Sequence, residues 1–131
     1  MSSTGVVHHI EIYVRDLPTS IEFWGWLLLQ LGYSEFQAWD QGISYIKDDT
    51  YIVFVQTEEK YLDIPYHRCR SGLNHLAFHA GTKEFVDTIT ADLKSRGVTI
   101  LYPDRHPHAG GEDSYAVFFE DPDRMKVEIT L

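Results

Sequence analysis

The residues best suited to metal chemistry in this chain are histidines and carboxylates. The sequence holds seven histidines and twenty Asp and Glu residues but a single cysteine, Cys69. One cysteine excludes an internal disulfide framework and a cysteine-based zinc knuckle. His9 and His75 each open a segment in which apolar and polar residues alternate, and Glu128 lies in a third such segment. Imidazole nitrogens and carboxylate oxygens on neighbouring rigid strands are typical ligands of a divalent metal.

Alternation predicts that these three side chains point away from the apolar face of their strands. Each strand should turn its apolar residues towards a helix layer and its other residues the opposite way. The predicted outward sets are His9, Glu11 and Tyr13; His75, Ala77 and His79; and Lys126, Glu128 and Thr130. We therefore expect His9, His75 and Glu128 to face one cavity. Three protein ligands leave coordination positions open for water and substrate, which is typical of catalytic metal sites.

An ordinary interpretation competes with this one. A histidine that opens a strand is more often a hydrogen-bonded structural residue than a metal ligand. Glu128, between Val127 and Ile129, also fits the solvent side of an edge strand. Ligation is favoured because His9 and His75 hold equivalent positions in an internal repeat.

The repeat consists of two strand–helix–three-strand units. Thr19 and Glu22 form a predicted capping box for the first helix, and Thr82 is the predicted cap of the second. The first unit is predicted to have a strand at 9–14, a helix from about 19 to 31, and strands at 33–39, 43–47 and 51–56. The second is predicted to have a strand at 75–80, a helix at 82–97, and strands at 98–102, 115–119 and 125–131.

These elements predict an α+β fold in one domain, 1–131. Module 1 spans about 6–56, a linker about 57–72, and module 2 about 73–131. Each βαβββ module alone would leave one face of its sheet uncovered. We therefore expect the modules to pair into a half-open, curved mixed sheet around a metal cleft.

Three motifs in order resemble the vicinal oxygen chelate superfamily, the glyoxalase, bleomycin-resistance and dioxygenase group. They are His9-Ile-Glu-Ile-Tyr-Val-Arg-Asp-Leu17, His75-Leu-Ala-Phe78 and Glu120-Asp-Pro-Asp-Arg-Met-Lys-Val-Glu128, and the resemblance runs from about Val6 to Leu131. It implies a glyoxalase-like fold around a divalent metal, with His9, His75 and Glu128 as the ligands. The metal would be Fe, Mn, Ni or Zn, among which the ligand types do not choose.

A fourth ligand position separates subclasses of this family. Glyoxalase I-like enzymes carry Glu or Gln on the last strand of the first module. Alignment of 49–54 on 123–128 puts Phe54 there, and a phenyl ring cannot ligate. Gln56 lies two residues on, and a small shift of register would bring it into the site. We expect both side chains to contact substrate, and the subclass stays open.

Further residues are candidates for proton transfer and substrate binding. Glu11 and His79 lie two positions beyond the expected ligands on the same faces and would suit general acid–base catalysis. Arg105-His-Pro-His-Ala-Gly-Gly111 is typical of a mobile loop, interpreted as a lid that brings His106 to the substrate. An exposed loop without a special role is the alternative. His8 is expected to point away from His9.

Two further features concern charge and association. Arg68 and Arg70 would hold an anionic substrate group or, as the favoured alternative, pair with nearby carboxylates. The segment Phe23-Trp-Gly-Trp-Leu-Leu-Leu29 is apolar almost all round. Core packing explains such a helix, and exposed tryptophans on it would mark the surface of a homodimer. Many relatives in the family are dimers, so we expect a homodimer here.

The net charge of −9 speaks against nucleic acid and anionic membranes as partners. The chain lacks a signal-peptide pattern at its start and an apolar run long enough to cross a bilayer, so a cytoplasmic location is expected. The predicted function is a divalent-metal-dependent enzyme acting on a small oxygenated substrate, by metal chelation and stabilisation of an oxyanion or enolate. Lyase, isomerase, transferase and oxygenase chemistry all fit. The alternative is a metal-free small-molecule binding protein of the bleomycin-resistance type, which the acidic charge would suit.

Overall fold

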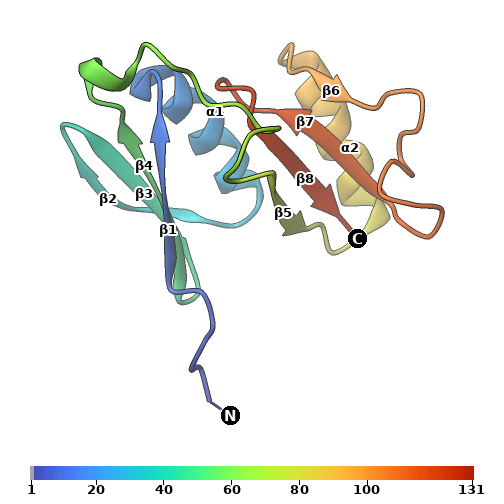
Figure 1. The fold of residues 1–131 in the computed structure, drawn as a ribbon. Coiled ribbons are helices and arrows are strands. Elements are labelled where there is room, and N and C mark those ends of the chain that lie inside the picture. The colour runs from blue at the N-terminus through green and yellow to red at the C-terminus, as the bar shows by residue number, and fades with distance from the viewer. Residues whose placement is uncertain (1) are drawn as a thin grey trace. The chain divides into compact units, whose positions relative to one another are not determined.

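The computed structural model describes residues 2–131, and the chain divides into two compact units, Met1–Pro65 and Tyr66–Leu131 (Figure 1). Each unit holds one four-stranded mixed sheet and one long helix, so the predicted α+β class and the βαβββ order of both units are confirmed. Among the described residues, no helix has the length and apolarity needed to span a membrane.

The first unit repeats the predicted order with small changes at the element ends. Its elements are β1 (His9–Val14), α1 (Leu17–Gln30), β2 (Ser34–Trp39), β3 (Gly42–Lys47), β4 (Thr50–Gln56) and the short 3-10 helix η1 (Glu59–Tyr61). The strand order is β1-β4-β3-β2, with β1 parallel to β4 and the other pairs antiparallel.

The second unit has the same topology. Its elements are β5 (His75–His79), α2 (Lys83–Ser95), β6 (Ile100–Leu101), β7 (Ala116–Glu120) and β8 (Lys126–Thr130). The strand order is β5-β8-β7-β6, again with the first and last strands of the unit parallel. β6 has two residues where the sequence predicts five, and a long loop connects it to β7.

The helix starts follow capping chemistry. Thr82 caps α2 as predicted, because its hydroxyl accepts a hydrogen bond from the Phe85 amide at 3.0 Å. The predicted start of α1 at Thr19 is wrong. Asp16 is the cap, its carboxylate accepting from the Thr19 amide at 3.1 Å and from the Thr19 hydroxyl. Pro18 occupies the first turn, where a missing N–H costs no hydrogen bond.

The apolar residues of α1 form the core of the first unit. Trp24, Leu27 and Leu28 have no exposed surface, and the Trp24 ring stacks on Phe54 of β4 with centroids 5.0 Å apart. Of the two tryptophans that would mark a dimer surface, Trp24 is therefore part of the unit's own core, whereas Trp26 is half-buried. The homodimer itself stays a prediction.

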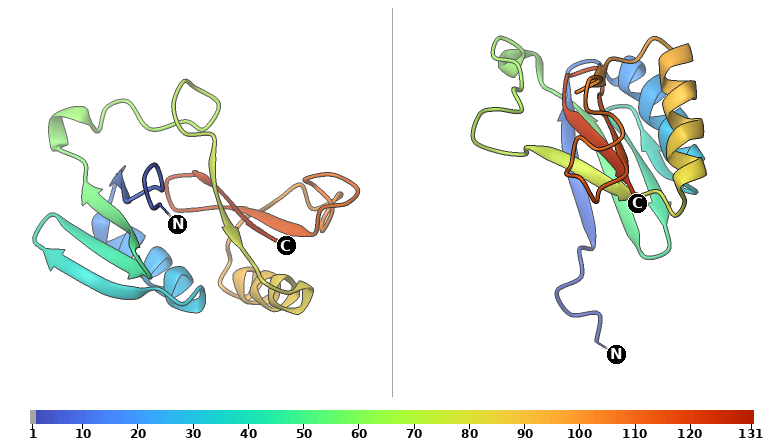
Figure 2. Two further views of the ribbon diagram at one scale, coloured as in Figure 1. Left: turned by 90° about the horizontal axis from the view of Figure 1, so that it is seen from below. Right: turned by 90° about the vertical axis from the view of Figure 1, so that its right-hand side faces the viewer.

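Each helix packs on one face of its own sheet (Figure 2). In the second unit, Val86, Ile89 and Leu93 of α2 are buried, as are Val127 and Ile129 of β8. The burial of alternate residues confirms the predicted faces. On β1, the side chains on the face opposite the helix are those of His9, Glu11 and Tyr13. On β5 and β8, this face carries His75 and Glu128.

Candidate functional site

His75 and Glu128 are in direct contact on the sheet face of the second unit that α2 does not cover. The His75 Nε2 atom lies 3.0 Å from Glu128 Oε1. The two residues are on adjacent parallel strands, where His75 is aligned with Lys126 and Glu128 lies two positions further on. Their side chains are 33% and 14% exposed, so the pair is sheltered and still open to a ligand.

Asn74 fixes the orientation of the His75 ring. The His75 Nδ1 atom lies 2.7 Å from Asn74 Oδ1, which can only accept a hydrogen bond, so Nδ1 carries the proton. Nε2 then presents either a second proton or a lone pair to the Glu128 carboxylate. In the lone-pair state two electron-rich atoms face each other at 3.0 Å, an arrangement that a shared cation stabilises.

His9 is held differently in the first unit. Its ring stacks on Tyr51 of β4 at a centroid distance of 4.7 Å and an interplanar angle of 3°. Its Nδ1 atom lies 2.9 Å from Nδ1 of His8, so the expectation that His8 points away is wrong. Its Nε2 atom lies 3.7 Å from a Glu11 carboxylate oxygen. These contacts direct both ring nitrogens towards polar partners.

The predicted ligand set is thus distributed over both units, His9 in the first and His75 with Glu128 in the second. Within either unit, residues 2–131 hold no group of three or more His, Cys, Asp or Glu side chains placed to bind a metal. The joint ligand set of His9, His75 and Glu128 therefore stays a prediction.

The two predicted acid–base residues are accessible. Glu11 is aligned with Val53 of β4, and its side chain is 59% exposed. His79 is aligned with Thr130 at the end of β5 and is exposed, on the same face as His75. Both lie on the predicted faces, and their part in proton transfer stays a prediction.

Phe54 and Gln56 lie on the helix side of β4, which corrects their expected role as substrate contacts. Phe54 is 1% exposed and packs on Trp24. The side-chain amide of Gln56 accepts from the Leu17 amide at 2.8 Å and donates to the Arg15 carbonyl at 2.8 Å, which fixes the turn before α1. The register shows why the alignment failed. His9 is aligned with Tyr51 as His75 is with Lys126, so Val53, not Phe54, is the equivalent of Glu128.

Hydrogen bonds hold the predicted lid in place, and the charged group with the largest effect on the pKa of His106 belongs to helix α2. Burial lowers the pKa of His106, and the Lys94 ammonium of α2 lowers that pKa further. The backbone of Pro107 accepts a hydrogen bond from the Ala116 amide at 2.9 Å, and His108 Nδ1 lies 2.7 Å from the Ser114 carbonyl. These contacts join the loop to the start of β7 and do not place His106 beside His75 and Glu128.

Arg68 pairs with a carboxylate, as the favoured alternative predicted. Its guanidinium donates to Glu120 Oε1 at 3.1 Å and to the Arg124 carbonyl at 2.9 Å, which attaches the segment before β5 to the end of β7. Cys69 is a free, exposed cysteine.

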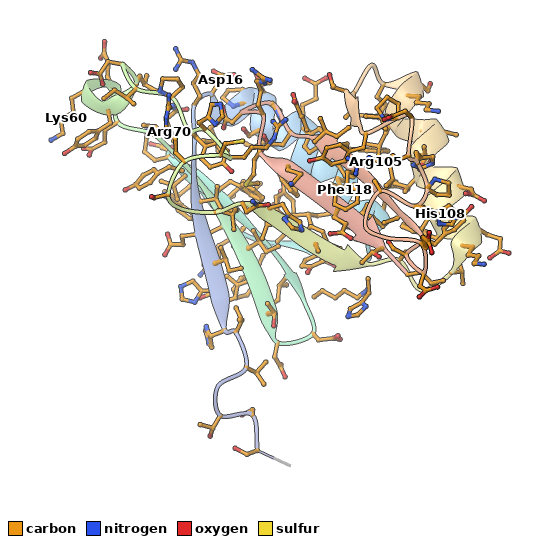
Figure 3. The ribbon with its side chains drawn as sticks, turned by 45° about the vertical axis from the view of Figure 1, so that its right-hand side comes forward. Asp16, Lys60, Arg70, Arg105, His108 and Phe118 are labelled. Carbon is orange, nitrogen blue, oxygen red and sulfur yellow. The ribbon has the colours of Figure 1, made fainter. Side chains whose placement is uncertain are left out.

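Sequence reasoning missed four residues of the second unit. Tyr102, Arg105 and Lys126 form a basic-aromatic cluster, and Phe118 lies between that cluster and His75, with ring centroids 5.6 Å from Tyr102 and 6.1 Å from His75. Figure 3 labels Arg105 and Phe118, which both contact the ring of Tyr102. The alternation of β8 placed Lys126 on the face of Glu128, but no pattern in the sequence predicted the return of Tyr102 to that face.

Two βαβββ units, each with its first and last strands parallel, define the glyoxalase-like fold. A model of the Glyoxalase/Bleomycin resistance protein/Dioxygenase superfamily matches residues 6–129, and the chain belongs to this superfamily.

Similar proteins extend over nearly the whole chain. It is 58% identical over 123 residues to the uncharacterized protein YqjT of Bacillus subtilis (strain 168), covering 94% of this chain and 96% of that protein. A crystal structure of a "putative glyoxalase" from Bacillus halodurans has 56% identity and a TM-score of 0.97, covering 98% of this chain and 96% of that one. A lactoylglutathione lyase from Agrobacterium tumefaciens, 18% identical with a TM-score of 0.67 and covering 98% of this chain and 95% of that one, shares the fold alone.

Proposed function

We propose that this protein is a divalent-metal-dependent enzyme that acts on a small oxygenated substrate. The observation that carries the proposal is the contact of His75 Nε2 with Glu128 Oε1 at 3.0 Å, while Asn74 holds the other ring nitrogen. Histidines that bind metals usually have their second ring nitrogen hydrogen-bonded to a polar neighbour, as His75 has, and a carboxylate beside the first nitrogen provides a second ligand.

The residues present fit such a group. In the proposed set His75 and Glu128 come from the second unit and His9 from the first, as the repeat and the superfamily imply. The set provides two neutral nitrogens and one carboxylate, which suit Fe, Mn, Ni or Zn. A bound divalent ion supplies charge stabilisation for an oxyanion or enolate that develops on substrate oxygens.

The chain's own side chains would then handle protons and orientation. We propose that His79 and Glu11 exchange protons with the substrate, because both are exposed on the strand faces that carry the ligands. Asn74 and Tyr51 are positioning residues that keep the rings of His75 and His9 in place. The reaction type within the superfamily is left to assay.

Metal analysis of the full chain, purified without an affinity tag, tests the proposal. We expect about one divalent metal per chain by elemental analysis. His75→Ala should lose the metal, whereas His79→Ala, on the same strand and face but outside the ligand set, should retain it. Titration calorimetry of metal-stripped protein with Mn²⁺, Ni²⁺ and Zn²⁺ measures the same difference as a dissociation constant.

Two results would overturn the proposal. One is the absence of metal in the purified chain together with no rise in melting temperature on adding any of these ions, since a ligand that binds the native state must raise it. The other is equal metal content in His75→Ala and His79→Ala. Either result would favour the metal-free binding protein, which a screen with cationic ligands would then examine.

A further inference from the structure

Tyr102 adopts a backbone conformation that is costly for a side chain of its size. It follows β6 with a φ of +53°, in the left-handed region that favours glycine. Its carbonyl accepts hydrogen bonds from the amides of Arg105 and His106, both at 3.0 Å, which close the turn. The turn directs the Tyr102 ring against Phe118 of β7. Strain of this kind persists where the surrounding structure requires it.

Two cations meet at this ring. The guanidinium carbon of Arg105 lies 4.8 Å from the ring centroid, and the Lys126 ammonium lies 5.7 Å from the same centroid. The ammonium also donates a hydrogen bond to the Tyr102 hydroxyl at 3.3 Å. Tyr102 therefore holds two positive charges from different elements at one place on the molecule.

Neither cation has a carboxylate partner within 4.0 Å among residues 2–131. Glu120 is aligned with Lys126 across β7 and β8 and would be the obvious partner. Its two carboxylate oxygens instead contact Arg68 at 3.1 Å and Arg124 at 3.4 Å. Two cations that contact one ring without a carboxylate between them create a local positive potential, which favours a bound anion.

The cluster lies beside the His75–Glu128 pair. Lys126 is aligned with His75 across β5 and β8, so the two side chains are neighbours on the same face of the sheet. Phe118 fills the space between Tyr102 and His75 and is aligned with Glu128 across β7 and β8. An anion held by Arg105 and Lys126 would therefore be only one or two side chains away from the proposed ligands.

We propose that Arg105 and Lys126, positioned by Tyr102, form a subsite for an oxyanion. The inference deepens the proposed function and, in its substrate assignment, rests on it: the substrate carries a carboxylate or a phosphate group a few atoms from the oxygens that reach the metal. The planar fork of an arginine and the point charge of a lysine together match both kinds of oxyanion.

An oxyanion titration of the metal-free full chain tests the subsite. Amide chemical shifts are followed by NMR while sodium phosphate or sodium acetate is added at constant ionic strength, balanced with sodium chloride. We expect saturable shifts centred on the amides of Tyr102, Arg105 and Lys126. A tighter response to phosphate indicates a phosphate-bearing substrate, and a tighter response to acetate indicates a carboxylate-bearing one; either supports the subsite.

Variants separate this site from general attraction of anions. Arg105→Gln and Lys126→Gln should each weaken binding by about tenfold, the usual effect of one charge-assisted hydrogen bond. Lys60→Gln is the matched control, because its ammonium lies 5.2 Å from a tyrosine ring centroid, that of Tyr61, in the other unit. Tyr102→Gly suits the backbone at φ +53° and removes only the ring, so binding should weaken in a protein that still folds.

The subsite is overturned if neither anion produces saturable shifts, or if Lys60→Gln weakens binding as much as Lys126→Gln does. Because the titration uses metal-free protein, its failure leaves the metal analysis untouched. Conversely, a chain that binds phosphate or acetate at Tyr102 but no metal at His75 would retain the subsite and lose the proposed function.

Discussion

Replacement of Phe54 by alanine should destabilise the first unit strongly. Phe54 is 1% exposed and stacks on Trp24, itself without exposed surface. Truncation of a buried phenylalanine costs about 3–5 kcal/mol, because transfer free energy is lost and a cavity remains. The aromatic pair adds about 0.5–1.5 kcal/mol beyond burial. We therefore expect Phe54→Ala to lower the free energy of unfolding by about 4 kcal/mol or more.

Urea titration followed by tryptophan fluorescence measures this loss directly, since Trp24 is in contact with the altered site. Tyr13→Ala is the matched control. Tyr13 is an aromatic residue of the neighbouring strand β1, but it is 69% exposed, so its removal should change stability by less than about 0.5 kcal/mol. A loss below about 1 kcal/mol in Phe54→Ala would refute the core assignment and restore Phe54 as a candidate substrate contact.

Three further predictions concern single side chains. Asn74→Ala frees the His75 ring and should weaken metal binding by about 10- to 100-fold in calorimetry; an unchanged affinity would show that Asn74 does not orient the ligand. Hydrogen bonds from the Thr19 hydroxyl and amide lower the pKa of Asp16, so its stabilisation of α1 is present above 3.8 and is lost as the pH falls through the lowered value. The stability gap between wild type and Asp16→Ala should therefore narrow in acid, and a constant gap in urea titrations would contradict this. Burial lowers the pKa of His106 below 6.5, so its ring should titrate below that value by NMR, and a midpoint above it would place the ring in solvent.

The sequence was sufficient to predict the faces of the strands, because alternation responds directly to burial on one side. β1 and β5 begin at the predicted residues, His9 and His75. Both faces were correct: on β1 Val14 is buried while Tyr13 is 69% exposed, and on β5 Phe78 is half-buried while His79 is exposed. The contact of His75 with Glu128 follows from that placement and from the parallel pairing of β5 with β8.

What failed depended on register and on backbone geometry. Phe54 was placed one position away from the true equivalent of Glu128, because a shift of one residue reverses the face of every side chain in a strand. The start of α1 was set at Thr19, although Asp16 and Thr19 form the cap together. The approach of Tyr102 to Lys126 depends on a left-handed residue, which a sequence without glycine at that position does not signal.

The pairing of β5 with β8 has a consequence for how the second unit folds. β5 is an edge strand whose single sheet neighbour is β8, so His75 gains its neighbour only by closing a loop to Glu128, 53 positions away. Contacts between residues so far apart in the sequence form late in folding, because the chain loses loop entropy before the contact contributes to stability. A fragment ending before β8 would leave His75 on a strand without a hydrogen-bonded neighbour. A separate peptide carrying β8 should restore both the strand pairing of β5 and the contact of His75 with Glu128. The chemistry of this pair therefore depends on assembly of the whole unit.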